Sequence, residues 1–346
     1  MTRKRLKVLV LMHEDLVPPL DLSGLTEKET ADYRTEVDVI AALGELGHEV
    51  VKLGVGSDLG PIRQAFAELQ PDVAFNLLVH FHGVAVYDQH VVSYLELLRK
   101  RYTGCNPRGL MLARDKALSK QLLAFHRIRV PRFIVFPMGR KVRRRGKVAY
   151  PLVVKSLNEE ASLGISQASL VTSDEKLKER VEFMHETFGV DVIAEEYVEG
   201  RELYLGIVGN DRLHTFPLWE LMLDQLPDHA PRIATAKVKW DLDYQKKYKI
   251  DTERAKNLPT GMEEQIAKTC ARIYRVLKLT GYARIDLRVA ENGNVYALEA
   301  NPNPDLQAKE DLAMSAKAAG IEYPELIQRI TNLGINYRVE WDAIES

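Results

Sequence analysis

The segment 281–305 constrains the fold of this chain more than any other, because its pattern is typical of a β-hairpin with polar side chains on one face. Residues 283–289 alternate between polar and apolar types, and the Glu-Asn-Gly-Asn sequence after them favours a tight turn. Side chains of a strand alternate between its two faces, so one face carries Arg284, Asp286 and Arg288.

The returning strand of the hairpin is expected at 295–298, and it leads into Glu299 and Asn301, which share a face. With Asp286 opposite, two carboxylates and an amide converge, and Mg²⁺ prefers hard oxygen ligands of this kind beside substrate phosphates. The alternative is a solvated hairpin whose arginines form ordinary cross-strand ion pairs with these carboxylates.

Length and composition restrict the class of protein. A chain of 346 residues with 46% hydrophobic content can bury one large core or two to three smaller ones. Its formal charge of -1 disfavours nucleic acid and anionic membranes as partners. Cys105 and Cys270 lack metal-binding spacing, which indicates free thiols in the cytoplasm. The apolar run 8–12 is too short for a signal peptide and predicts a buried strand.

The first third of the chain alternates strand and helix patterns, which predicts a Rossmann-like parallel sheet covered by helices. We expect this N-terminal domain to span residues 1–114. It would contain strands at 6–12, 50–55 and 73–78 and helices at 36–46, 61–69 and 90–101. The segment 13–34 is a long polar loop, for which we expect function or mobility.

Neither of two common nucleotide motifs is present. The glycines at 54, 56 and 60 have the wrong spacing for a dinucleotide fingerprint, and the chain contains no P-loop sequence. The remaining sequence predicts two α+β units, residues 115–199 and 200–346. Strands are expected at 133–136, 150–155, 192–198 and 203–208, and helices at 114–125 and 176–188. The basic run 139–147 favours a solvated turn over a phosphate or RNA site.

Lys155 ends an apolar strand, where a fixed cation suits phosphate oxygens. The loop 158–164 beside it offers backbone N–H groups and the Ser162 hydroxyl, which together form an anion site. The alternative is a lysine at a strand end that simply reaches solvent.

Taken together, the sequence Arg-Ile-Asp-Leu, a turn and Leu-Glu-Ala-Asn-Pro resembles the metal-binding hairpin of the ATP-grasp superfamily. The spacing is most similar to that of D-alanine-D-alanine ligases, and the resemblance extends from about 73 to 330. It implies a two-part ATP-grasp fold after the N-terminal domain. It also implies that Asp286, Glu299 and Asn301 hold Mg²⁺ or Mn²⁺ on the ATP phosphates, and that Arg284 stabilises charge on the reacting carboxyl.

The same resemblance implies an ATP site along the chain. Glu195 and Val198 would contact adenine, which Tyr197 covers and Leu298 underlies, and Glu202 would bind the ribose. The phosphates would meet Lys116, Lys155, Ser162 and one lysine of the pair Lys237 and Lys239. We favour Lys239 because an aromatic residue follows it.

Residues around the expected substrates depart from the family pattern. The family motif His-Gly-x-x-Gly-Glu-Asp-Gly is retained at His82 and Gly83 but is largely lost after them. The glycine and serine that receive the second substrate become Asp305 and Glu310, which would repel a free carboxylate. His82 and Asp305 are therefore candidate substrate residues in altered pockets.

The resemblance thus implies an ADP-forming enzyme that joins small-molecule carboxylates and amines, such as amino acids or peptides, through an acyl phosphate. Neither nucleic acid nor a membrane is expected as a partner, and the resemblance suggests a homodimer. Three alternatives stay open: a literal D-alanine-D-alanine ligase, an ATP-grasp small-molecule kinase, and an ATP-binding scaffold without turnover.

Overall fold

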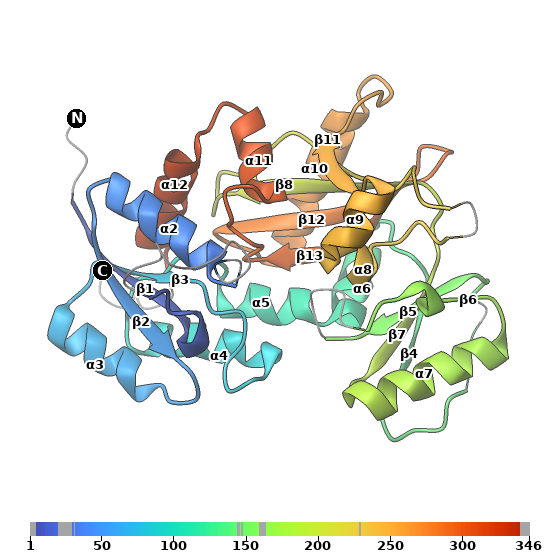
Figure 1. The fold of residues 1–346 in the computed structure, drawn as a ribbon, viewed down its shortest axis with the longest axis horizontal. Helices are drawn as coiled ribbons and strands as arrows, with labels where there is room; N and C mark the ends of the chain where they lie inside the picture. Colours follow the sequence, from blue (N-terminus) through green and yellow to red (C-terminus); the bar gives the residue numbers. More distant parts are fainter. Residues whose placement is uncertain are drawn as a thin grey trace.

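The computed structural model describes residues 5–19, 30, 32–143, 146, 148–158, 164–227 and 230–339 of the chain. Strands within these residues form three sheets, the first parallel and the other two antiparallel. Figure 1 shows the first sheet in blue on the left, the second in green at the lower right and the third in yellow to red above it. This mixed α/β architecture confirms the predicted fold class.

The first sheet has the strand order β2-β1-β3, with β1 (Lys7–His13), β2 (Glu49–Val55) and β3 (Val73–Asn76) all parallel. Helices α2 (Arg34–Glu45) and α3 (Gly60–Leu69) provide the two crossovers. Every residue of β1 except its two ends is buried. Central strands of parallel sheets are covered on both faces, which explains the continuous apolar run.

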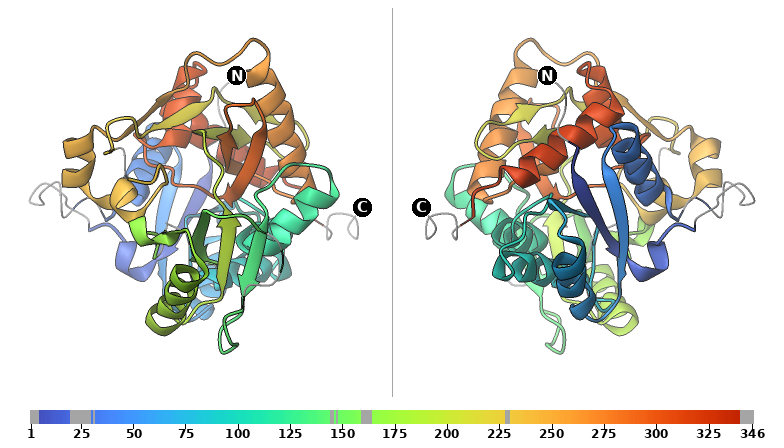
Figure 2. Two further views of the ribbon diagram at one scale, coloured as in Figure 1. Left: turned by 90° about the vertical axis from the view of Figure 1, so that its right-hand side faces the viewer. Right: turned by 90° about the vertical axis from the view of Figure 1, so that its left-hand side faces the viewer.

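Helix α12 (Tyr323–Ile335) comes from the far end of the sequence, yet it packs against α2 and β3. Its Ile327 and Ile330 share one core cluster with Val8 and Val10 of β1. The right-hand view of Figure 2 shows this red helix beside the blue strands. The chain therefore closes one face of its first sheet with its last described helix.

The second sheet has the order β4-β7-β5-β6 and is antiparallel. Its strands are β4 (Phe133–Phe136), β5 (Leu152–Ser156), β6 (Leu170–Val171) and β7 (Val192–Glu196). Helix α7 (Asp174–Phe188) packs against β5, β6 and β7 through a core that includes Leu177, Val181 and Met184. The Ser173 hydroxyl caps its start, and Gly189 ends it with a φ of 65°.

The third sheet has the order β11-β10-β8-β12-β13, with β9 paired to β8. Its strands are β8 (Arg201–Val208), β9 (His214–Thr215), β10 (Trp219–Met222), β11 (Asp251–Arg254), β12 (Tyr282–Val289) and β13 (Val295–Pro302), and its helices are α10 (Met262–Val276) and α11 (Asp311–Ala318). The predicted hairpin is thus β12 and β13, although β13 extends past the predicted end at Leu298.

The other helical segments connect these units. They are η1 (Glu14–Leu16), η2 (Ala85–Tyr87), α4 (Asp88–Leu97), α5 (Pro107–Arg114), α6 (Lys116–Phe125), η3 (Gln167–Ser169), α8 (Ala236–Trp240) and α9 (Leu242–Tyr248). The helix predicted at 90–101 is shorter than expected, because Arg99 has a left-handed φ of 56°. Helix α5 was not predicted, although Asn106 caps it and Pro107 opens it.

The three sheets lie within the predicted units 1–114, 115–199 and 200–346, and that division stays a prediction. Among the described residues, no helix has the length and apolar character that crossing a bilayer requires.

Candidate active site

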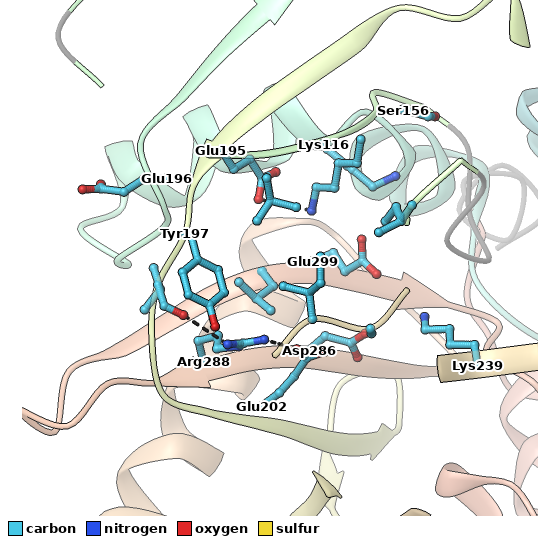
Figure 3. A pocket seen from close by; sticks show the side chains of 17 residues that line it. Lys116, Ser156, Glu195, Glu196, Tyr197, Glu202, Lys239, Asp286, Arg288 and Glu299 are labelled. Atoms are coloured by element: carbon cyan, nitrogen blue, oxygen red, sulfur yellow. Dashed lines mark hydrogen bonds and ion pairs between the residues drawn. The ribbon is translucent and has the colours of Figure 1, made fainter. Parts of the chain in front are cut away.

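A cavity between the second and third sheets brings together most of the residues predicted to bind ATP. Figure 3 shows the 17 side chains that line it. The predicted residues among them are Lys116, Lys155, Glu195, Tyr197, Val198, Glu202, Lys239, Asp286, Leu298 and Glu299. Arg284, Asn301, His82 and Asp305 do not line this cavity, and Ser162 lies outside the described residues.

The lysines of the cavity come from different elements and are held by the fold. Lys116 is the first residue of α6, whose N-terminus is capped by the Asp115 carboxylate at 2.9 Å from two backbone N–H groups. Lys155 lies on β5 and is 8% exposed. Its Nζ lies 3.1 Å from Oε2 of Glu195, so it is a buried, paired cation and not a lysine that reaches into solvent.

Lys120, which was not predicted as a site residue, does not line the cavity and is 1% exposed. Its Nζ pairs with Oε1 of Glu195 at 3.3 Å and donates a hydrogen bond to the carbonyl of Leu298. Burial lowers the pKa of Lys120 to about 8, and Glu195 opposes that effect. The signal in the sequence was its position one helical turn after Lys116.

Glu195 therefore has an ion-pair partner at each carboxylate oxygen, Lys120 at one and Lys155 at the other. It lies on β7, directly opposite Val153 of β5. The predicted contact between this carboxylate and adenine stays a prediction, and it must compete with two lysines. What the structure does show is that Glu195 fixes the positions of both cations.

Glu202 and Arg288 form a cross-strand ion pair at 2.6 Å between β8 and β12. Arg288 also donates to the carbonyl of Val198 at 3.2 Å and lies over the ring of Tyr197, 5.4 Å from its centroid. Tyr204 donates to the second oxygen of Glu202 at 3.0 Å. This pair joins β12 to β8 and not the two strands of the hairpin, and both of its side chains are buried. It fixes the predicted adenine segment against the hairpin.

Asp286 and Glu299 lie directly opposite each other in the β12–β13 pairing, and Asn301 lies opposite Arg284. The register shifts beside Asp286, and this irregularity lets Leu298 and Glu299, which are consecutive, both face the cavity. In a regular strand, consecutive side chains point to opposite faces, so only one of these two would reach the cavity. The resemblance had placed Leu298 there, whereas the pattern of the strand could not.

The two opposed carboxylates differ in their electrostatics. Burial raises the pKa of Asp286 to about 6, against the lowering effect of Arg284. Burial also disfavours the charge of Glu299, but Lys155, Lys116 and Lys239 outweigh it and lower that pKa to about 2. Glu299 is consequently a carboxylate at neutral pH, held ionised by the lysines around it.

The hairpin residues fit a hard divalent cation. Asp286 and Glu299 supply opposed carboxylates, and the amide nitrogen of Asn301 is buried without a hydrogen-bond partner. A flip of the amide exchanges its oxygen and nitrogen. The unsatisfied position can therefore hold the oxygen, which is the atom that a metal ion requires as a ligand. Among the described residues, no three His, Cys, Asp or Glu side chains group to hold a metal, as expected for a trio that includes an amide.

Arg284 lies next to this trio and binds carboxylates with each of its guanidinium nitrogens. Its Nε and Nη2 donate to Asp286 at 2.8 and 3.0 Å, and its Nη1 donates to Asp311 at 3.3 Å. The guanidinium also lies over Tyr204, 4.7 Å from the ring centroid. Asp311, at the start of α11, was not identified from the sequence.

The lysine pair before Trp240 is separated by the structure. Lys239 lines the cavity from α8, on the side where Figure 3 shows Asp286 and Glu299, whereas Lys237 is exposed and does not line it. This placement supports the choice of Lys239, and its role at a phosphate stays a prediction.

The two candidate substrate residues lie outside the cavity. His82 is exposed, and its backbone N–H donates to the carbonyl of Gly56 at 3.0 Å. Asp305 accepts hydrogen bonds from Thr35 of α2 at 2.8 Å and from its neighbour Gln307. Their contacts with a substrate stay predictions.

A parallel-sheet domain followed by two antiparallel sheets that enclose a lysine-lined and carboxylate-lined cavity is the ATP-grasp arrangement. The family model described as "D-ala D-ala ligase C-terminus" matches residues 124–332, more than half of the chain. The chain belongs to this family.

Comparisons with known proteins extend over nearly the whole chain. An uncharacterized protein y4sG of Sinorhizobium fredii is 29% identical over 85% of both chains. The D-alanine--D-alanine ligase of Desulforudis audaxviator is 29% identical over 90% of this chain and 96% of its own. The solved D-alanine--D-alanine ligase of Bacillus anthracis, complexed with ATP, covers 95% and 97% of the two chains with 24% identity and a TM-score of 0.73. The VanG D-Ala:D-Ser ligase of Enterococcus faecalis has 16% identity, 95% and 99% coverage and a TM-score of 0.69.

Proposed function

We propose that this chain is an ATP-dependent ligase that joins a carboxylate to an amine through an acyl phosphate and releases ADP. The observation that carries the proposal is the meeting, in one cavity, of three lysines with the opposed carboxylates Asp286 and Glu299. Lys116, Lys155 and Lys239 come from three separate elements, and each lowers the pKa of Glu299. A triphosphate with its divalent cation has the charge pattern that such a cluster complements.

The rest of the cavity suits the nucleoside. Tyr197, Val198 and Leu298 offer apolar surface to the base, and Glu202 offers a carboxylate to the ribose hydroxyls. Arg288 holds both ends of this segment, because it binds Glu202 and the Val198 carbonyl. Glu195 acts indirectly in this proposal, since it positions Lys155 and Lys120.

Asp286, Glu299 and Asn301 would hold Mg²⁺ or Mn²⁺ in this proposal. When bound, such an ion neutralises phosphate charge and helps align the reacting oxygens. The protein residues contribute a preformed site on a rigid hairpin, in which the lysines keep Glu299 ionised.

The chemistry then requires no side-chain nucleophile. An oxygen of the substrate carboxylate attacks the terminal phosphorus of ATP, the bond to ADP breaks, and an acyl phosphate forms. The amine nitrogen attacks the acyl carbon, inorganic phosphate leaves, and the amine proton passes to solvent. Arg284 stabilises the negative charge that develops on the acyl oxygen.

The substrate pair is where this chain departs from its relatives. The ligases to which it is similar are named for D-alanine--D-alanine and D-Ala:D-Ser, which favours amino acids or related small molecules as substrates. The resemblance implies that the acidic residues Asp305 and Glu310 stand where the family has a glycine and a serine that receive the second substrate. We therefore propose altered amino-acid pockets around a retained ATP reaction.

Trapping with hydroxylamine tests the proposal. The full chain is incubated with Mg-ATP, hydroxylamine and single carboxylic acids, including D- and L-amino acids and dipeptides, and ADP and hydroxamates are quantified. We expect a hydroxamate from at least one acid, because hydroxylamine intercepts an acyl phosphate. A phosphorylated product without any hydroxamate would instead identify a kinase.

Two neighbouring lysines provide a matched pair for the same assay. Lys239→Met should lower hydroxamate formation by about tenfold or more, because it removes a cation facing the phosphates. Lys237→Met removes an exposed charge two positions away on the same short helix and should leave the rate unchanged. Equal effects of the two substitutions would contradict the proposed phosphate site.

A further inference from the structure

Arg288 lines the cavity from β12 and is 3% exposed, yet one of its donors is unused. Its Nη1 donates to the carbonyls of Val198 and Gly200 at 3.2 and 3.4 Å. Its Nη2 donates to the carboxylate of Glu202 at 2.6 Å and to the carbonyl of Arg232. The Nε–H is buried and has no acceptor among the described residues. Buried donors without an acceptor are rare, so this atom indicates the place of a ligand group that accepts a hydrogen bond.

The position of this donor is tied to the groups that Nη2 binds. Nε and Nη2 are bonded to the same carbon of a rigid, planar guanidinium, so their acceptors lie near each other. Tyr197 covers a face of the guanidinium, whose carbon lies 5.4 Å from the ring centroid, and Figure 3 shows the two side chains at the cavity. The acceptor for the Nε–H is therefore expected in the plane of the guanidinium, in the part of the cavity that Glu202 also lines.

Glu202 restricts the chemistry of that ligand group. Its oxygens accept hydrogen bonds from Arg288 and Tyr204, so it is a carboxylate, and a phosphate or carboxylate beside it would meet a like charge. A ring nitrogen could accept from the Nε–H but would donate nothing to Glu202. A hydroxyl both donates and accepts, which suits a carboxylate and an N–H that lie near each other. In ATP, the hydroxyls of the nucleoside are those of the ribose.

We propose that Arg288 selects ribose over deoxyribose: its Nε–H donates to a ribose hydroxyl, while Glu202 accepts a hydrogen bond from the same hydroxyl or from the one next to it. The inference rests on the proposed function and specifies the nucleotide of the same site. Arg288 also keeps its hold on Val198 and Glu202, because those contacts use only Nη1 and Nη2. A deoxynucleotide would leave the buried Nε–H unpaired, which is why sites built to bind a hydroxyl reject an analogue without it.

The test measures equilibrium binding, which does not depend on turnover. The full chain is titrated in a calorimeter with the Mg²⁺ complexes of ATP, 2′-deoxy-ATP and 3′-deoxy-ATP, without any carboxylic acid or amine. We expect at least one of the two deoxynucleotides to bind about 100-fold or more weakly than ATP. If both deoxynucleotides bind as tightly as ATP, the inference is wrong.

Arg288→Lys decides whether the selection comes from Arg288. Lysine keeps a positive charge beside Glu202 but has no Nε–H, so the ratio of dissociation constants should fall to about tenfold or less. A substitution that acted only through the fold would weaken all three nucleotides alike, and an unchanged ratio would overturn the inference. Arg288→Gln, whose amide can still donate to Glu202, is a second route if Arg288→Lys fails to fold, and it should lower the ratio as well.

Arg201→Lys is the matched control. It makes the same exchange on β8, where Nε and Nη2 of Arg201 bind Glu220 at 2.7 and 2.5 Å and the side chain does not line the cavity. The ratio of dissociation constants should stay unchanged in this variant, and an equal fall in both lysine variants would contradict a specific role for Arg288.

The outcomes separate the inference from the function beneath it. Tight ATP binding and hydroxamate formation, together with ratios near one, would overturn the selection by Arg288 and leave the ligase proposal standing. Absence of binding by all three nucleotides, with neither ADP nor hydroxamate formed, would overturn the ligase proposal and the inference together.

Discussion

The two sides of the candidate site balance their charges in opposite ways. On the nucleotide side, two lysines, Lys120 and Lys155, share the single carboxylate of Glu195. Beside the hairpin, the single guanidinium of Arg284 is shared by two carboxylates, those of Asp286 and Asp311. The comparison teaches that neighbouring parts of one site combine two opposite charge patterns, two cations around one anion and two anions around one cation.

We expect the largest effect from a substitution on the nucleotide side. Glu299→Gln removes the carboxylate opposite Asp286 and should lower ADP release by about 100-fold or more, because positioning and charge stabilisation of the phosphates are lost together. Steady-state ADP release with circular dichroism as a folding check measures this. Glu291→Gln, in the exposed turn of the same hairpin, is the matched control and should retain activity. A Glu299→Gln enzyme with normal turnover would refute the proposed site.

Replacement of the buried Lys120 tests whether the nucleotide side depends on both lysines that share Glu195. Lys120→Met leaves the Leu298 carbonyl without its donor and Glu195 with one lysine, and should cost about 3 kcal/mol of unfolding free energy. Urea denaturation measures the loss, and the KM for ATP should rise in parallel.

Lys178→Met is the matched control for this experiment. It breaks an exposed ion pair with Glu182 and should cost less than about 1 kcal/mol. Similar losses in Lys120→Met and Lys178→Met would mean that the buried lysine adds no stability to the nucleotide side.

A smaller effect concerns the carboxylates near the end of the hairpin, Asp305 and its neighbour Glu36. Glu36 of α2 is 3% exposed, and burial raises its pKa to about 7, with the charge of Asp305 adding to the shift. Because the folded state holds this proton more tightly than the unfolded state, the stabilisation is full below pH 4.5 and is lost as pH rises through 7.

Glu36→Gln should therefore be more stable than the parent at pH 8, by on the order of 1–2 kcal/mol, and the difference should vanish near pH 4.5. Thermal unfolding at a series of pH values measures this crossover. A difference that does not change with pH would show that Glu36 titrates normally, and that negative charge does not accumulate beside Asp305.

Local patterns predicted the hairpin and marked Lys155, whereas the resemblance to the ATP-grasp superfamily was needed to place most of the other cavity residues. The hairpin could be recognised because strand alternation and turn chemistry act within a few residues, and Lys155 was marked by the apolar strand before it. The shorter helix α4 and the unpredicted helix α5 show the limit of the same approach. Arg99 adopts a left-handed conformation that its residue type does not predict, and Asn106 caps a helix that the sequence pattern did not predict.

Contacts between distant segments could not be predicted in the same way. The pair of Arg288 with Glu202 depends on the register of β12 against β8, and the bulge at Leu298 depends on the pairing of β12 with β13. The contact of Arg284 with Asp311 requires α11 to begin beside the hairpin. Each is set by tertiary packing, which no short stretch of sequence specifies.

Helix α12 has a consequence for the order in which the molecule can be made. Ile327 and Ile330 pack in one core with Val8 and Val10, yet they are translated more than 300 residues after them. Until then one apolar face of the first sheet lacks its permanent cover, and exposed faces of this kind attract chaperones. We expect nascent chains that stop before residue 323 to be held by such factors and released once α12 emerges, which ribosome-bound truncations can measure.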